Sequence, residues 1–91
     1  MLHELLRRDD VNEEVELRSR FGFMAYHGGT LEKTTDPIAR EAAALADASY
    51  YGVVQAHEDP THISSTEVAP EHSEALASFL AHVDVVVTVH G

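Results

Sequence analysis

The chain has 91 residues and a hydrophobic content of 44%, which suits one small folded domain with a single core. It contains no cysteine, so disulfides and thiolate metal sites are excluded and a reducing compartment is favoured. Sixteen acidic and six basic residues give a formal net charge of −10, and no Lys or Arg follows Arg40. Because nucleic-acid binding needs basic side chains to neutralise phosphates, this balance argues against a nucleic-acid partner.

The sequence also argues against a membrane role. Its start, "MLHELLRRDD", lacks the apolar stretch of a secretory signal, and no segment reaches the roughly 18 apolar residues of a membrane span. The acidic surface is interpreted as solubilising, and adaptation to a high-salt cytosol is the alternative. We therefore expect a soluble, cytoplasmic protein.

Residues 1–13 are strongly charged and are interpreted as an N-terminal segment that precedes the domain. Its three leucines can share one face of a short helix: Leu2, Leu5 and Leu6. The next stretch, "EEVELRSR", alternates as a strand does, which predicts that Val15 and Leu17 face the core. "FGFMAY", Phe21–Tyr26, follows as a buried strand.

A helix is predicted after this strand by "DPIAREAAALADA", with Asp36 as its N-cap and Pro37 at its first helical position. Its inner face is expected to consist of four apolar residues: Ile38, Ala42, Leu45 and Ala46. The following "SYYGVVQAH" is rich in aromatic and β-branched residues, which predicts a third strand.

The second half of the chain continues the alternation. "HEDPTH" indicates a loop and "HISST" a short strand. "PEHSEALASFLAHV" predicts a second helix, whose inner residues follow the i, i+3, i+4, i+7 pattern: Leu76, Phe79, Leu80 and Val83. The last apolar run, Val83–Val89, is almost continuous, which is typical of a strand covered on both faces.

Strands that alternate with helices predict a single α/β domain over residues 14–91. We expect a layered α/β/α arrangement with a mostly parallel or mixed sheet. A strand covered on both faces should not end a domain one residue past its last side chain. The sequence is therefore expected to be the N-terminal half of a longer domain, incomplete at its C-terminus.

Two histidines stand at the ends of predicted strands and carry the functional hypothesis. His27 directly follows one strand and His90 follows another, and the carboxyl ends of parallel strands meet at one edge of a sheet. Glu32 lies beyond Gly28 and Gly29, which tolerate the positive φ of a bend that would bring it back beside His27. Two histidines and one carboxylate are a known zinc ligand set in hydrolases, with a fourth position left for water.

Other interpretations of these histidines stay open. A His-Gly-Gly turn can simply end a strand, without any metal. "HEDPTH" offers a rival metal cluster in a loop that is more typical of a solvated turn: His57, Glu58, Asp59 and His62. His62 also begins the short predicted strand, from which it could orient a substrate or stabilise an oxyanion at the same edge.

Three blocks of the sequence resemble a known family. In order and spacing, "HGGTLEKTTDPIA", "HISST" and "VVVTVHG" are similar to the signature of the phage-type poly-γ-glutamate hydrolases, over about Phe21–Gly91. The resemblance implies a zinc peptidase with a fold like that of carboxypeptidase A and the phosphorylase/hydrolase-like proteins. It implies one Zn²⁺ per chain, held by His27, Glu32 and His90, and a metal-activated water that attacks the γ-glutamyl amide carbonyl.

The same resemblance implies poly-γ-glutamate, or a related γ-glutamyl peptide, as the substrate. His62 would lie close to it, and Lys33 and Arg40 would offer positive charge near the site. Members of the family are much longer than this chain, and in carboxypeptidase-like enzymes the general-base glutamate comes from the later part. We therefore expect the general base to be absent from this chain. If a phage carries the gene, release from the cell would follow lysis.

Three further functions remain open on the sequence alone. The first is a zinc amidase acting on peptidoglycan, whose family shares the "HGG" strand end but has its glutamate much farther along. The second is a non-catalytic, truncated metal-binding module. The third is an interaction module without metal, which would associate, for example as a homo-oligomer, through exposed sheet edges.

Overall fold

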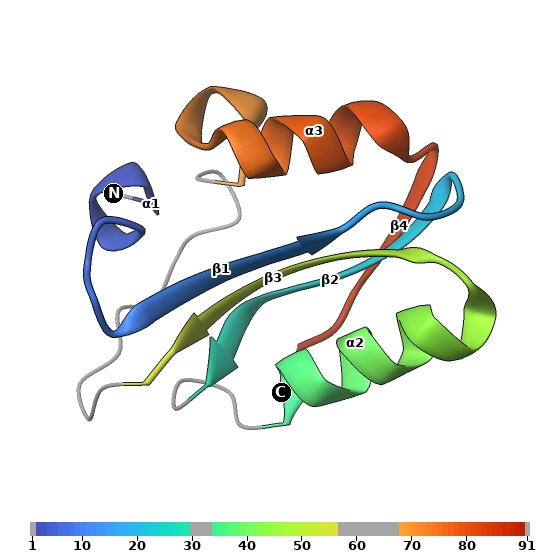
Figure 1. Cartoon of the computed structure of the whole chain (residues 1–91), viewed down its shortest axis with the longest axis horizontal. Coiled ribbons are helices and arrows are strands. Elements are labelled where there is room, and N and C mark those ends of the chain that lie inside the picture. The colour runs from blue at the N-terminus through green and yellow to red at the C-terminus, as the bar shows by residue number, and fades with distance from the viewer. Residues whose placement is uncertain (1, 30–33, 57–67, 91) are drawn as a thin grey trace.

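The computed structural model describes residues 2–29, 34–56 and 68–90, which form a four-stranded sheet with helices on its two faces (Figure 1). In chain order the elements are α1 (Leu2–Leu5), β1 (Val11–Glu16), β2 (Phe21–Gly29), α2 (Thr35–Ala46), β3 (Ser49–Gln55), the 3₁₀-helix η2 (Pro70–His72), α3 (Glu74–His82) and β4 (Val85–Thr88). The sheet order is β1-β3-β2-β4, with β1 antiparallel to β3 and the other neighbours parallel. The predicted α/β fold with a mixed sheet is confirmed.

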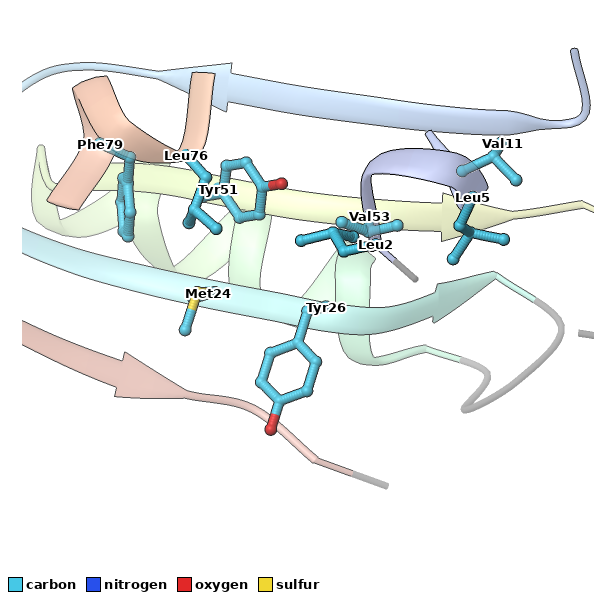
Figure 2. Packing of buried hydrophobic residues seen from close by; sticks show 9 residues of the cluster. All are labelled: Leu2, Leu5, Val11, Met24, Tyr26, Tyr51, Val53, Leu76 and Phe79. Carbon is cyan, nitrogen blue, oxygen red and sulfur yellow. The ribbon is translucent and has the colours of Figure 1, made fainter. Parts of the chain in front are cut away.

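The face of the sheet under α3 holds the larger core (Figure 2). Its buried residues are Leu2, Leu5, Val11, Met24, Tyr26, Tyr51, Val53, Leu76 and Phe79. The predicted inner face of this helix is confirmed, because Leu76 and Phe79 are buried and Leu80 and Val83 pack against them. The helix begins later than predicted, since the Ser73 hydroxyl accepts a hydrogen bond from the Leu76 amide and so caps it.

The face under α2 is built from smaller side chains, and here the predicted inner face was wrong. Ile38 is 54% exposed and Leu45 82% exposed. The buried contacts come instead from a cluster formed by Ala25, Ala39, Ala43, Ala48 and Tyr50. Alanine side chains are small, so they let the backbone of α2 pack close to the sheet. For this reason the alanines of the helix face the sheet, and its largest apolar residues do not. The N-cap is Thr34, and Asp36 lies within the first turn.

The two edge strands also differ from the sequence predictions. Val15 and Leu17 were expected to face the core, but they are 38% and 48% exposed. On β4, which was expected to be covered on both faces, Val85 and Val87 are 53% and 41% exposed. The physical reason is that α2 packs on β2 and β3, and among the described residues β4 pairs with β2 alone. No helix in the described part of the chain is long and apolar enough to cross a membrane.

Candidate metal centre

The C-terminal end of β2 contains an irregularity at the predicted site. The strand continues to Gly29, so His27 lies inside it rather than just after it. The ladder to β3 pairs Ala25 with Gly52, Gly28 with Val54 and Gly29 with Gln55. Two residues of β2, Tyr26 and His27, therefore stand opposite one residue of β3. This is a β-bulge, a feature that re-aims side chains and is common next to functional sites.

His27, which lies in the bulge, is close to His90. β2 and β4 are parallel neighbours, which is the condition for their ends to meet, and the hydrogen bond from the Val89 amide to the Met24 carbonyl (2.8 Å) extends their pairing to the residue before His90. The two imidazole rings have centroids 5.8 Å apart and planes inclined by 65°. The structure thus joins the two strand-end histidines at one edge of the sheet.

Tyr26 contacts both imidazoles. Its ring centroid lies 4.4 Å from that of His27 and 5.5 Å from that of His90, each in an edge-to-face arrangement. The Tyr26 side chain projects from β2 toward the end of β4 (Figure 2). Tyr26 and His27 are 6% and 4% exposed, so the histidine is held in a packed environment and not on a mobile surface. These ring contacts restrict how the imidazoles can turn.

The two glycines after His27 are required for different reasons. Gly29 has φ +76°, and a Cβ there would stand 2.1 Å from the Gln55 carbonyl oxygen, so only glycine fits. A Cβ on Gly28 would stand 2.8 Å from the Cβ of Asp36. The predicted positive φ thus occurs at Gly29, whereas Gly28 makes room for a side chain from α2.

Asp36 links this strand end to α2. Its Oδ1 accepts a hydrogen bond from the Gly29 amide at 3.0 Å, and its Oδ2 accepts one from Arg40 Nη2 at 3.1 Å. Arg40 Nη2 also lies 3.4 Å from Glu14 Oε1, and its guanidinium stands over the Tyr50 ring. Arg40 also lines a hollow that contains three glutamates. The lining residues of this hollow are Glu13, Glu14, Val15, Glu16, Arg40 and Tyr50. Arg40, predicted to contact substrate, is therefore surrounded by carboxylates.

The comparison with protein families adds the decisive observation. The model of a family described as poly-gamma-glutamate hydrolase matches residues 3–91. The chain belongs to the poly-gamma-glutamate hydrolase family. The resemblance found in the sequence is confirmed, and the match extends into the charged N-terminal segment that the three motif blocks did not include. No curated protein and no solved structure gives a significant match.

Membership in the poly-gamma-glutamate hydrolase family makes poly-γ-glutamate the expected substrate. His27 and His90 lie together, whereas Arg40 lies on α2 and is linked to the end of β2 through Asp36. The other predicted residues fall outside the described ranges: Glu32, Lys33 and His62, and also His57, Glu58 and Asp59 of the rival cluster. Within residues 2–29, 34–56 and 68–90, no group of three or more potential metal ligands occurs.

The separation of His27 and His90 is close to that of two histidines bound to one zinc ion. Imidazoles that share one tetrahedral zinc, each bound at about 2.0–2.1 Å, have ring centroids roughly 5 Å apart. The separation of 5.8 Å between His27 and His90 is within about 1 Å of this value. The separation of the two rings is therefore compatible with a shared metal.

Two residues at this site were not identified from the sequence. Tyr26 was assigned to the core of a strand, although its position next to the "HGG" motif is a usable signal. Asp36 was assigned as an N-cap, because an aspartate before a proline at the start of a helix is typical of that role. Its contact with Gly29 depends on how α2 packs against β2, which the local sequence does not encode.

Proposed function

We propose that this member of the poly-gamma-glutamate hydrolase family cleaves γ-glutamyl amide bonds with one zinc ion per chain, held by His27, His90 and Glu32. The observation that supports this proposal is the meeting of His27 and His90 at the shared edge of β2 and β4, at a ring separation close to that of a zinc-bound pair. When bound, zinc would polarise the scissile carbonyl and activate a water as the nucleophile.

The chain's own residues would orient the metal and the substrate. The buried ring of Tyr26 would hold both imidazoles in fixed directions, which reduces the reorganisation needed on binding. We propose that Lys33 and His62 contact the substrate, whose carboxylates attract cations. Arg40 could take part only if it released Asp36 or Glu14, with which it is already paired.

The test is the metal content of purified protein, measured by plasma mass spectrometry after exposure to zinc at neutral pH. We expect about one zinc per chain in the parent, and loss of that zinc in a His27→Ala, His90→Ala double variant. A matched control replaces two other histidines, His3 and His72, by alanine and should retain the metal. Hydrolysis of a synthetic γ-glutamyl oligomer is expected to be slow, because the general base is expected to be absent from this chain, and to be lost together with the metal.

Two results would contradict the proposal. If the parent protein contained no zinc after exposure to the metal, the proposed metal centre would be refuted. A double variant that retained zinc as well as the control does would place the metal elsewhere in the chain.

A further inference from the structure

The carboxylate of Asp36 is buried at the candidate site. Its hydrogen bonds go to Gly29 and Arg40 and not to the two histidines. Its residue is 7% exposed. Removing a charged carboxylate from water is strongly unfavourable unless hydrogen bonds and opposite charges replace the lost solvation. Here the Gly29 amide and the Arg40 guanidinium provide that replacement, one on each oxygen. Because both of its oxygens are hydrogen-bonded, the Asp36 side chain can hold the neighbouring backbone in one position.

What Asp36 touches is the backbone immediately after the bulge. The missing side chain of Gly28 leaves the space that the Asp36 Cβ occupies, and the Gly29 amide donates to Oδ1. On the other side of the bulge, the pairing of Ala25 with Gly52 fixes the strand. Tyr26 and His27 therefore lie between two anchored points, and Asp36 contributes to one of them.

We propose that Asp36 is a positioning residue that holds the strand end so that the His27 imidazole faces His90, and that Arg40 in turn holds Asp36. This inference rests on the proposed function, since it assigns to Asp36 an effect on zinc binding. It differs from a role in helix stability alone. A carboxylate in the first turn of α2 stabilises that helix wherever the strand lies, whereas positioning changes the metal affinity of the folded protein.

The chemistry of the carboxylate suggests a substitution that tests its hydrogen bonds with little change in shape. Both oxygens of Asp36 accept hydrogen bonds, but an asparagine has one acceptor oxygen and one donor amide group. Asp36→Asn keeps the shape of the side chain and yet cannot satisfy Gly29 and Arg40 at the same time. Asp36→Ala removes both contacts. The matched control is Asp84→Asn, which makes the same change of charge in an aspartate paired with Arg20 at the opposite end of β2.

The experiment measures zinc affinity by competition with a chromophoric chelator, and the fold by circular dichroism and thermal melting without metal. We expect Asp36→Ala to weaken zinc binding by about 10-fold to 100-fold, the usual effect of removing a residue that orients a metal ligand. Asp36→Asn should lie between Asp36→Ala and the parent, and Asp84→Asn should bind like the parent. The absorption bands of the Co²⁺-loaded protein should change in the Asp36 variants and not in the control.

Each outcome has a definite meaning. If the parent and Asp84→Asn bind zinc and the folded Asp36 variants bind it equally well, the positioning role is overturned and the proposed function stands. A loss in Asp36→Asn that matches the loss in Asp84→Asn would also overturn it, because net charge would then be the cause. If the parent binds no zinc, the proposed function itself fails. Should Asp36→Ala not fold, the isosteric Asp36→Asn gives the result.

Discussion

β2 begins with regular pairing and an exposed residue, Phe21, whereas its C-terminal end is irregular and buried. Phe21 pairs in register with Val85, and these side chains are 40% and 53% exposed. Beside them, Arg20 and Asp84 form an exposed ion pair. At the other end, a bulge holds Tyr26 and His27, each less than 10% exposed.

The difference shows where the fold accepts irregular geometry. A regular ladder is enough to join β2 to its neighbours, as its first half demonstrates. The bulge interrupts the regular pairing with β3, and two successive side chains of β2 contact the imidazole of His90, which follows β4. We interpret the C-terminal half of β2 as shaped by function and the N-terminal half as shaped by pairing. The predictions below test this difference.

The largest effect is expected from removing an aromatic ring at the buried end. Tyr26→Ala should lower the free energy of unfolding by about 3–5 kcal/mol, because it leaves a cavity in the core under α3. Phe21→Ala at the open end should cost about 1 kcal/mol or less, since that ring is partly solvated. Urea titration of both variants measures the contrast. Similar losses at the two ends would contradict it.

A second contrast uses the glycines. Gly29→Ala should cost about 2–3 kcal/mol, because the new Cβ meets the Gln55 backbone at a residue with φ +76°. Gly22→Ala should cost less, about 1–2 kcal/mol, because its Cβ meets the side chains of Phe79 and Val83 and not the backbone, although the buried Phe79 ring must shift within the core. The measurement is again the urea midpoint. A greater loss at Gly22 would show that side-chain packing is less adaptable there than we infer.

A third prediction concerns the middle of the sheet, where Tyr51 pairs with Met24. Burial, and then the hydrogen bond that its hydroxyl donates to Glu13, raise the pKa of Tyr51 well above its ordinary value of 10.0. Because the folded-state pKa lies above the unfolded one, the stabilisation is complete below about pH 10 and declines as the pH rises further. We expect a loss of about 1 kcal/mol at about pH 11.

The control for this pH dependence is Tyr51→Phe. It should be less stable at neutral pH, because Glu13 loses a hydrogen-bond donor, but it should lose less stability between about pH 8 and about pH 11. Urea midpoints at the two pH values give the comparison. An unchanged slope in the variant would assign the alkaline loss to other groups.

The smallest effect is expected at the exposed ion pair. The hydrogen bond from Arg20 and its charge lower the pKa of Asp84. Any stabilisation from this pair is present above the unfolded-state pKa and is lost as the pH falls through the lower folded-state value. Because both groups are solvated, Arg20→Ala should leave the urea midpoint unchanged within error at neutral pH. A clear loss would mean that the open end of β2 depends on specific contacts after all.

Regular periodicity made part of the fold predictable. The spacing of Leu76 and Phe79 predicts the buried face of α3, and the aromatic and β-branched run of β3 predicts a strand. On α2 the same procedure selected Ile38 and Leu45, which are exposed, because alanines make the close contact with the sheet. Periodicity locates a buried face when large side chains fill it, and it fails when the buried face consists of small ones.

The candidate site could be predicted only in outline. That His27 and His90 meet follows from the general rule that parallel strands end at one edge of a sheet. The bulge depends on the register between β2 and β3, and the contact of Asp36 with Gly29 depends on the position of α2. Both are set by tertiary packing, so no short stretch of sequence contains them.

The order of strands in the sheet has a consequence for how the protein folds. β2, α2 and β3 follow one another in the chain and pack together, whereas β4 pairs with β2 from the opposite end of the sequence. Closing a long loop costs more entropy than local pairing, so β4 should dock late in folding. His90 would then reach His27 in one of the last steps, and an intermediate with a formed β2-α2-β3 unit would still lack the paired histidines.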